Sequence, residues 1–180
     1  MIDYDSSAPP GAPNYENVAG ATASGVELGV HAVPLDPLSL GVSYTHLHTD
    51  VTNPGFDSSS GAALAAGRPL LRRPQHAARL DADYRVRDLG TLSLAITYVG
   101  KREDQDFATY PFPRVTLPAY ARVDGAARLE LLRSRGAGRA PGVALSARAE
   151  NLLDRAYEEV RNFPARRRTI FLGARLALAY

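Results

Sequence analysis

The amino-acid sequence predicts an all-β protein, an antiparallel transmembrane β-barrel. Residues 168–180 supply the first observation, because apolar side chains fall on every second position and the run ends on an aromatic residue. The apolar positions are Ile170, Leu172, Ala174, Leu176, Leu178 and Tyr180. The second observation is that this alternation recurs in segment after segment, and the third is that short turns alternate with long polar loops. Strands between lipid and an aqueous lumen show this pattern.

About eight strands are predicted, of which the first three precede residue 51. A stub at residues 1–5 is followed by a Ser-, Pro- and Gly-rich loop at 6–14. Residues 15–33 form the second strand, where Val26, Leu28 and Val30 alternate with small or polar residues before a turn at 34–37. The third strand, 38–50, carries Leu40 and Val42 on one face and leads into a Gly- and Ser-rich loop at 52–67, which is too long for a hairpin turn.

The remaining five strands repeat the pattern. The fourth, 73–87, alternates apolar residues with Arg and Asp and ends in a turn at 88–90. The fifth, 91–98, runs into a long loop at 101–118, and the sixth, 121–131, alternates most regularly. A turn containing Gly136 and Gly138 leads to the seventh strand, 143–150. A loop at 151–166 then precedes the terminal strand, 168–180.

The alternation of short and long connections is typical of a barrel with tight periplasmic turns and long outer loops. We therefore expect the loops at 6–14, 52–67, 101–118 and 151–166 to lie outside the cell. Charges on the inner faces of the second, fourth and sixth strands predict a wet lumen, although pairing across a small barrel is the alternative. Two other architectures remain open: a self-closing eight-stranded barrel with a structural or adhesin role, and a soluble β-sandwich or lipocalin-like binder.

Composition excludes several classes of protein. The 180 residues contain no cysteine, which excludes disulfides and thiolate chemistry. Apolar runs are too short for a membrane-spanning helix, and residues 1–7 do not resemble a signal peptide. Aromatic and basic residues do not interleave in a stripe, so no nucleic-acid partner is predicted. Residues 57–60, Asp-Ser-Ser-Ser, have no histidine partner at a meaningful spacing, so we expect no enzyme activity.

Two motifs resemble a known family. Residues 150–157, Glu-Asn-Leu-Leu-Asp-Arg-Ala-Tyr, precede Phe163-Pro164, an arginine run and an alternating strand with a terminal aromatic residue. This arrangement resembles the closing hairpin of TonB-dependent outer-membrane receptors. The segment at 17–27, which ends in Gly-Val-Glu, is similar to a recurring segment of that family. The resemblance implies a 22-stranded barrel with an N-terminal plug, of which residues 1–180 would be the C-terminal part.

Within that family, residues 70–73 and 99–111 most resemble receptors for cobalamin, vitamin B12. The resemblance implies that the whole receptor binds its ligand on the outer side and imports it through the inner-membrane TonB complex. A siderophore receptor is the alternative. The plug and the TonB-contacting segment would lie outside this chain, so we expect this polypeptide alone not to transport. It also implies contacts with the outer membrane and lipopolysaccharide, and recognition of Tyr180 by the barrel assembly machinery.

The resemblance implies two ligand-binding residues. Arg72 matches a position where a guanidinium would donate to the amides or phosphate of a corrinoid, and the alternative is that Arg72 and Arg73 cap the lipid-facing rim. Phe107 matches a position that is usually tyrosine in the family, so stacking on a flat ligand would survive without the hydroxyl hydrogen bond. The alternative for Phe107 is packing on Tyr110 or Phe112.

No cofactor or metal is predicted. Glu103, Asp104 and Asp106 offer carboxylates of the kind that bind calcium, but their spacing matches no EF-hand, and we expect a solvated acidic loop. His46 and His48 share one strand face, which permits metal ligation, although two histidines without a third ligand usually indicate rim residues. The arginines at 166–168 are expected in a solvated loop rather than on lipid phosphates.

Overall fold

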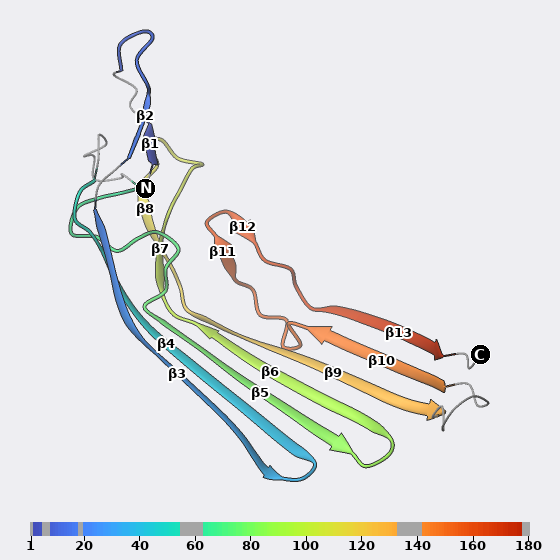
Figure 1. Cartoon of the computed structure of the whole chain (residues 1–180). Coiled ribbons are helices and arrows are strands. Elements are labelled where there is room, and N and C mark those ends of the chain that lie inside the picture. The colour runs from blue at the N-terminus through green and yellow to red at the C-terminus, as the bar shows by residue number, and fades with distance from the viewer. Residues whose placement is uncertain (1, 5–7, 18–19, 55–62, 133–141, 178–180) are drawn as a thin grey trace.

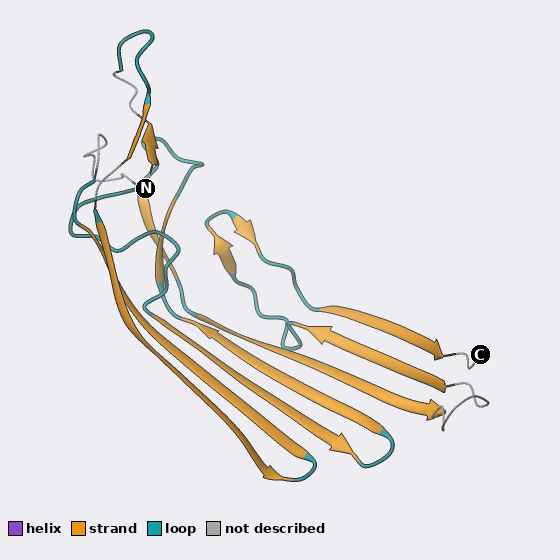
Figure 2. Ribbon diagram, viewed as in Figure 1, coloured by secondary structure: helices purple, strands orange, loops and turns teal. Residues whose placement is uncertain are grey.

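The computed structural model describes residues 2–4, 8–17, 20–54, 63–132 and 142–177, with thirteen strands. Seven long strands form one antiparallel sheet, which curves across Figure 1 and carries no helix in the described ranges (Figure 2). Their order in the sheet is β13-β10-β9-β6-β5-β4-β3. The strands are β3 (Ala21–Leu35), β4 (Leu38–Val51), β5 (His76–Val86), β6 (Gly90–Val99), β9 (Tyr120–Leu132), β10 (Gly142–Glu150) and β13 (Thr169–Ala177).

Three two-stranded hairpins accompany the sheet. They pair β1 (Ile2–Tyr4) with β2 (Tyr15–Asn17), β7 (Arg102–Gln105) with β8 (Arg114–Leu117), and β11 (Glu158–Val160) with β12 (Phe163–Pro164). All three lie beyond the same end of the long strands, whereas the short turns β3–β4 and β5–β6 lie at the other end (Figure 1). The predicted alternation of short and long connections is therefore confirmed for the connections that the structure describes.

The main difference from the predicted strands concerns residues 1–5. That stub does contain a strand, β1, but it pairs with β2, so the large sheet has seven strands rather than eight. The predicted loops at 101–118 and 151–166 each contain a short hairpin that local alternation does not reveal. The turn with Gly136 and Gly138, and Tyr180 at the end of the last strand, lie outside the described residues.

One face of the sheet is apolar and uncovered. The register aligns Val42 with Leu80, Leu80 with Ile96 and Ile96 with Val123, so apolar side chains form rows across the strands. Leu172 of β13 is 82% exposed. The total accessible surface is 12402 Å², against about 8,500 Å² expected for a folded soluble chain of this mass. This sheet therefore has an apolar face suited to lipid rather than a core of its own.

The opposite face is polar, and its charges pair along the strands. Arg79 contacts Asp81 at 2.5 Å on β5, and Arg122 contacts Asp124 at 3.0 Å on β9. The same spacing, an arginine two residues before an acid, pairs Arg128 with Glu130 and Arg148 with Glu150. Residues two apart in a strand share a face, so each pair is neutral within its own strand. This face is therefore polar, as the alternation predicts, and its charges pair along the strands. That it borders a wet lumen stays a prediction.

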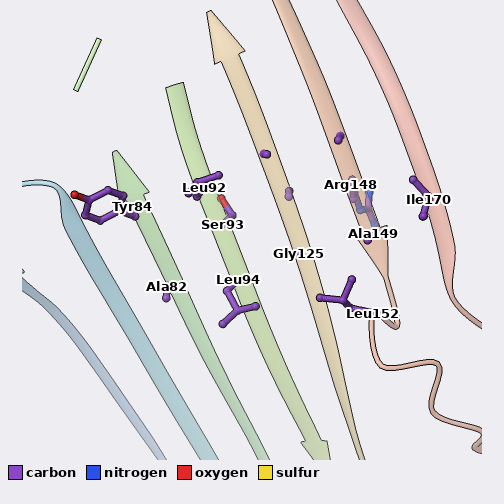
Figure 3. A pocket seen from close by; sticks show the side chains of 13 residues that line it. Ala82, Tyr84, Leu92, Ser93, Leu94, Gly125, Arg148, Ala149, Leu152 and Ile170 are labelled. Carbon is purple, nitrogen blue, oxygen red and sulfur yellow. The ribbon is translucent and has the colours of Figure 1, made fainter. Parts of the chain in front are cut away.

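A shallow hollow of about 500 Å³ lies on the apolar face. Small residues of β9 and β10, including Gly125 and Ala149, form its floor, and Leu94 of β6 and Ile170 of β13 flank it (Figure 3). Its lining is almost entirely apolar, as lipid acyl chains require.

The sheet is open, with β3 and β13 at its two edges, and these strands do not pair with each other in the described residues. This arrangement does not fit a self-closing eight-stranded barrel. Nowhere in the described ranges is there a helix long and apolar enough to cross a membrane. Buried apolar side chains gather near the loop end of the sheet, where Val51, Leu117 and Tyr120 are enclosed.

Candidate functional site

Three segments at the loop end of the sheet are joined by arginines and acids into one unit, which we call the outer cluster. They are residues 67–75 between β4 and β5, the β7–β8 hairpin, and residues 151–166 between β10 and β13. Each segment follows a different strand pair, so they meet only because the sheet sets those strands side by side (Figure 1). The links come from three acids, Glu103 and Asp104 of β7 and Asp106 directly after it.

Glu103 joins the β7–β8 hairpin to residues 67–75. Its carboxylate contacts Arg68 at 2.7 Å and Arg114 of β8 at 2.5 Å. The guanidinium of Arg114 also donates to the Pro69 carbonyl oxygen at 2.6 Å and to the Ala63 carbonyl oxygen at 3.1 Å. One buried arginine therefore holds the hairpin against the loop that follows β4.

Asp104 is fully buried and accepts three hydrogen bonds. Oδ1 accepts from Arg72 Nε at 2.8 Å and from the Gln105 amide at 2.9 Å, and Oδ2 accepts from the Arg161 amide at 2.7 Å. Burial opposes the charged form, but the hydrogen bonds from Arg161, Arg72 and Gln105 outweigh it and hold the pKa of this carboxyl below its ordinary value. Asp104 is therefore an ionised group that joins all three segments.

Asp106 makes a further link to residues 151–166. Its Oδ1 accepts from Asn162 Nδ2 at 2.7 Å, and its Oδ2 lies 3.5 Å from Arg161 Nε. The prediction of a solvated acidic loop at Glu103, Asp104 and Asp106 is therefore wrong. Each carboxylate faces an arginine from a distant part of the chain, and that pairing draws the acids out of water.

Aromatic side chains extend the outer cluster onto β9. The Arg102 guanidinium lies 5.4 Å from the ring centroid of Tyr120 and donates through Nη2 to the Glu158 carbonyl oxygen at 2.5 Å. Tyr120 stacks on Tyr157 with centroids 4.1 Å apart. These contacts hold β7 and the segment before β11 against the first residue of β9.

The motif at 150–157 organises its own loop. Asn151 is 1% exposed with φ of +52°, and its side chain bonds the Arg155 amide and carbonyl and the Arg166 carbonyl. Asp154 accepts from Arg167 Nε, at 2.9 Å, and from the Arg168 amide, at 3.0 Å. The Arg167 side chain and the Arg168 amide lower the pKa of Asp154 strongly. This motif closes the base of the loop, and Arg167 is ion-paired rather than freely solvated.

Arg72 and Phe107 line one hollow of about 580 Å³ at the outer cluster. Arg72 has φ of +59°, its amide donates to the Glu103 carbonyl oxygen at 2.7 Å, and its side chain is 42% exposed although Nε is bound to Asp104. The neighbouring Arg73 lines a separate hollow. Phe107 contacts Phe112, with centroids 5.8 Å apart, and also faces the hollow.

A second wall of this hollow comes from residues 159–165. Phe163 is 69% exposed, and Glu159 supplies the only carboxylate among the described lining residues. The other lining residues are Val160, Pro164 and Ala165. One guanidinium, one carboxylate and two exposed aromatic rings suit a ligand with a flat apolar body and hydrogen-bonding edges.

The ring contact of His46 is with a histidine on the neighbouring strand, His76. His46 faces His76 across β4 and β5, with ring centroids 5.0 Å apart, and Tyr44 Oη lies 2.8 Å from His76 Nδ1. Among the described residues, no three His, Cys, Asp or Glu side chains lie where they could hold a metal ion. His46 and His76 therefore belong to an aromatic and histidine patch on the outer end of the apolar face. Residues 57–60 lie outside the described residues.

Comparisons with known proteins agree with this architecture. Residues 1–152 match the family described as TonB dependent receptor-like, beta-barrel. The vitamin B12 transporter BtuB of Vibrio cholerae serotype O1 is 31% identical over 174 residues, which are 96% of this chain and 24% of that protein. The chain therefore spans about a quarter of the length of this relative.

Solved structures of outer-membrane receptors share the fold. The siderophore receptor PiuA from Acinetobacter baumannii superposes with a TM-score of 0.71 at 24% identity, over 99% of this chain and 24% of that one. The ferripyoverdine receptor of the outer membrane of Pseudomonas aeruginosa also gives 0.71, at 16% identity, over 97% of this chain and 22% of that one. This chain belongs to the TonB-dependent receptor family, as part of the β-barrel of an outer-membrane receptor.

Proposed function

We propose that this chain forms part of the wall and outer binding face of a receptor that takes up cobalamin or another corrinoid. The observation that carries the proposal is the hollow at the outer cluster, where Arg72 and Phe107 line one surface together with Phe163. A corrinoid presents a broad ring to the aromatic side chains and amide or phosphate oxygens to a guanidinium. Sequence similarity to the vitamin B12 transporter from Vibrio cholerae supports the choice of ligand.

The uptake step needs parts beyond these 180 residues. We propose that the polar face of the sheet encloses a plug domain and that the TonB complex drives import through it. The arginine and acid pairs along β5, β9 and β10 support an aqueous interior. Tyr180 would be the contact for the barrel assembly machinery, and lipopolysaccharide would surround the outer end of the apolar face.

The test measures equilibrium binding of cyanocobalamin to the purified full-length receptor in detergent. Arg72→Ala should weaken binding roughly 10- to 100-fold, because a hydrogen bond from a charged donor contributes about 1.5–3 kcal/mol. Phe107→Ala should weaken it about tenfold through lost stacking and apolar contact. Arg73→Ala is the matched control, since Arg73 lines a different hollow. It should change affinity less than about twofold, because a surface substitution away from the ligand usually has a small effect.

The proposal fails if the wild type does not bind cyanocobalamin, or if Arg72→Ala and Arg73→Ala are indistinguishable. Binding of a ferric siderophore in place of cyanocobalamin would instead assign the receptor to iron uptake. Gel migration of each variant before and after heating in detergent shows whether the barrel has folded. A loss of affinity through misfolding is thereby distinguished from the loss of a ligand contact.

A further inference from the structure

The buried carboxylate of Asp104 does more than fill space beneath the proposed binding hollow. It lies outside the set of residues that line the hollow, yet it bonds one lining residue directly and holds the segment that supplies the opposite wall. Arg72 contributes the guanidinium on one side, and residues 159–165 contribute the other side. One anion therefore connects two walls that come from loops far apart in the chain.

The three bonds to Asp104 divide by function. The Gln105 amide bond is local and keeps the carboxylate turned inward at the end of β7. The Arg72 Nε bond uses one of the five N–H donors of a guanidinium, which leaves donors for an oxygen atom in the hollow. The Arg161 amide bond fixes the backbone between β11 and β12, two residues before the exposed Phe163.

The chemistry of this position requires a carboxylate. Three N–H groups converge on its two oxygens, and an ionised carboxylate accepts them all. An asparagine of the same shape keeps one oxygen but turns an NH2 group toward one of the donors. It therefore loses at least one bond and places donor against donor in a buried site.

We propose that Asp104 is a positioning residue for ligand recognition. It aims the guanidinium of Arg72 into the hollow and locks the β11–β12 wall opposite it, so that a corrinoid meets a preformed site. This inference rests on the proposed function and adds a residue that touches no ligand. Preorganisation raises affinity because the side chain and loop are ordered before the ligand arrives.

The test is a double-mutant cycle on the full-length receptor with cyanocobalamin as the probe. Asp104→Asn alone should weaken binding about 3- to 10-fold, and Arg72→Ala alone about 10- to 100-fold. The double variant should bind more tightly than the product of the two single effects predicts, because part of the effect of the carboxylate passes through that guanidinium. Effects that multiply, or an Asp104→Asn variant with wild-type affinity, would overturn the inference. Multiplying effects would indicate a general loosening of the loops, because such loosening lowers affinity equally with and without the Arg72 side chain.

A second measurement separates this inference from the choice of ligand. Hydrogen exchange followed by mass spectrometry, without ligand, should show faster exchange in Asp104→Asn at both 67–75 and 158–165. Asp154→Asn is the matched control, because the Asp154 side chain bonds Arg167 and Arg168, and faster exchange should stay within 151–168 and leave 67–75 as in the wild type. If the wild type binds no cyanocobalamin, the proposed ligand fails while exchange still decides the role of Asp104. Faster exchange confined to 102–117 refutes the link between the two walls.

Discussion

The two faces of β6 predict opposite responses to an added charge. Leu94 is the fifth of the ten residues of β6, is 40% exposed on the apolar face, and pairs across the sheet with Ala82 and Gly125. The described residues that line the hollow beside Leu94 include no carboxylate to pair with an arginine. Arginine near the middle of the bilayer costs about 2–4 kcal/mol on the lipid face of a barrel, so Leu94→Arg should lower the folding equilibrium constant roughly 30- to 900-fold.

The next residue supplies the matched control. Ala95 points to the polar face, pairs with Asp81 and Asp124, and borders a hollow of about 330 Å³. Ala95→Arg should therefore change the free energy of unfolding by less than about 1 kcal/mol. Guanidinium titration of the full-length receptor in phosphatidylcholine vesicles, followed by heat-modifiable migration, measures both variants. Equal destabilisation, or a larger loss for Ala95→Arg, would show that the two faces are assigned the wrong way round.

Two further predictions concern the loop end. Asn151→Ala should destabilise the loop at 151–166 by about 2–4 kcal/mol, because three backbone groups lose their partner and alanine is strained at φ of +52°. Limited proteolysis of the variant should cut this loop first. Resistance equal to that of the wild type would contradict the prediction. Since the folded pKa of Asp104 lies below its ordinary value of 3.8, its contribution to stability is complete above about pH 4 and is lost as pH falls through the folded pKa. Spin labels at Tyr110 and Phe163 should then move apart reversibly as pH falls through that folded pKa, while Asp104→Asn should show the wider distance already at pH 7.

The wall of the barrel follows from local pattern, and the sequence therefore predicts most of it. A strand between lipid and water must place apolar and polar side chains on alternate positions, and each long strand of the sheet does so. Strand boundaries shift by a few residues where loop residues form hydrogen bonds outside the sheet. Strand β5 starts at His76 rather than at residue 73, because the Arg72 amide donates to the Glu103 carbonyl oxygen.

The outer cluster could not be derived in this way, because its contacts join segments distant in the sequence. Nothing near Asp104 indicates that Arg72 and the Arg161 amide will reach it, so three closely spaced acids suggest a solvated loop. Asn151 stands in a motif that carried the family resemblance, but only the structure shows that its side chain closes the loop. The resemblance implies that Arg72 and Phe107 each contact the ligand, but only the structure shows that both line one hollow.

The use of buried charge in the outer cluster follows from what the wall requires. A barrel strand presents its apolar residues to lipid, so few remain to pack the loops, and the enclosed apolar residues near that end are Val51, Leu117 and Tyr120. Charge-assisted hydrogen bonds supply the missing cohesion, and they are directional, so they also fix orientation. Removing one partner leaves several buried donors unsatisfied at once, whereas losing a methyl group from an exposed loop residue leaves none. The shape of the outer face should therefore depend more on Asp104 and Asn151 than on any apolar residue of the loops.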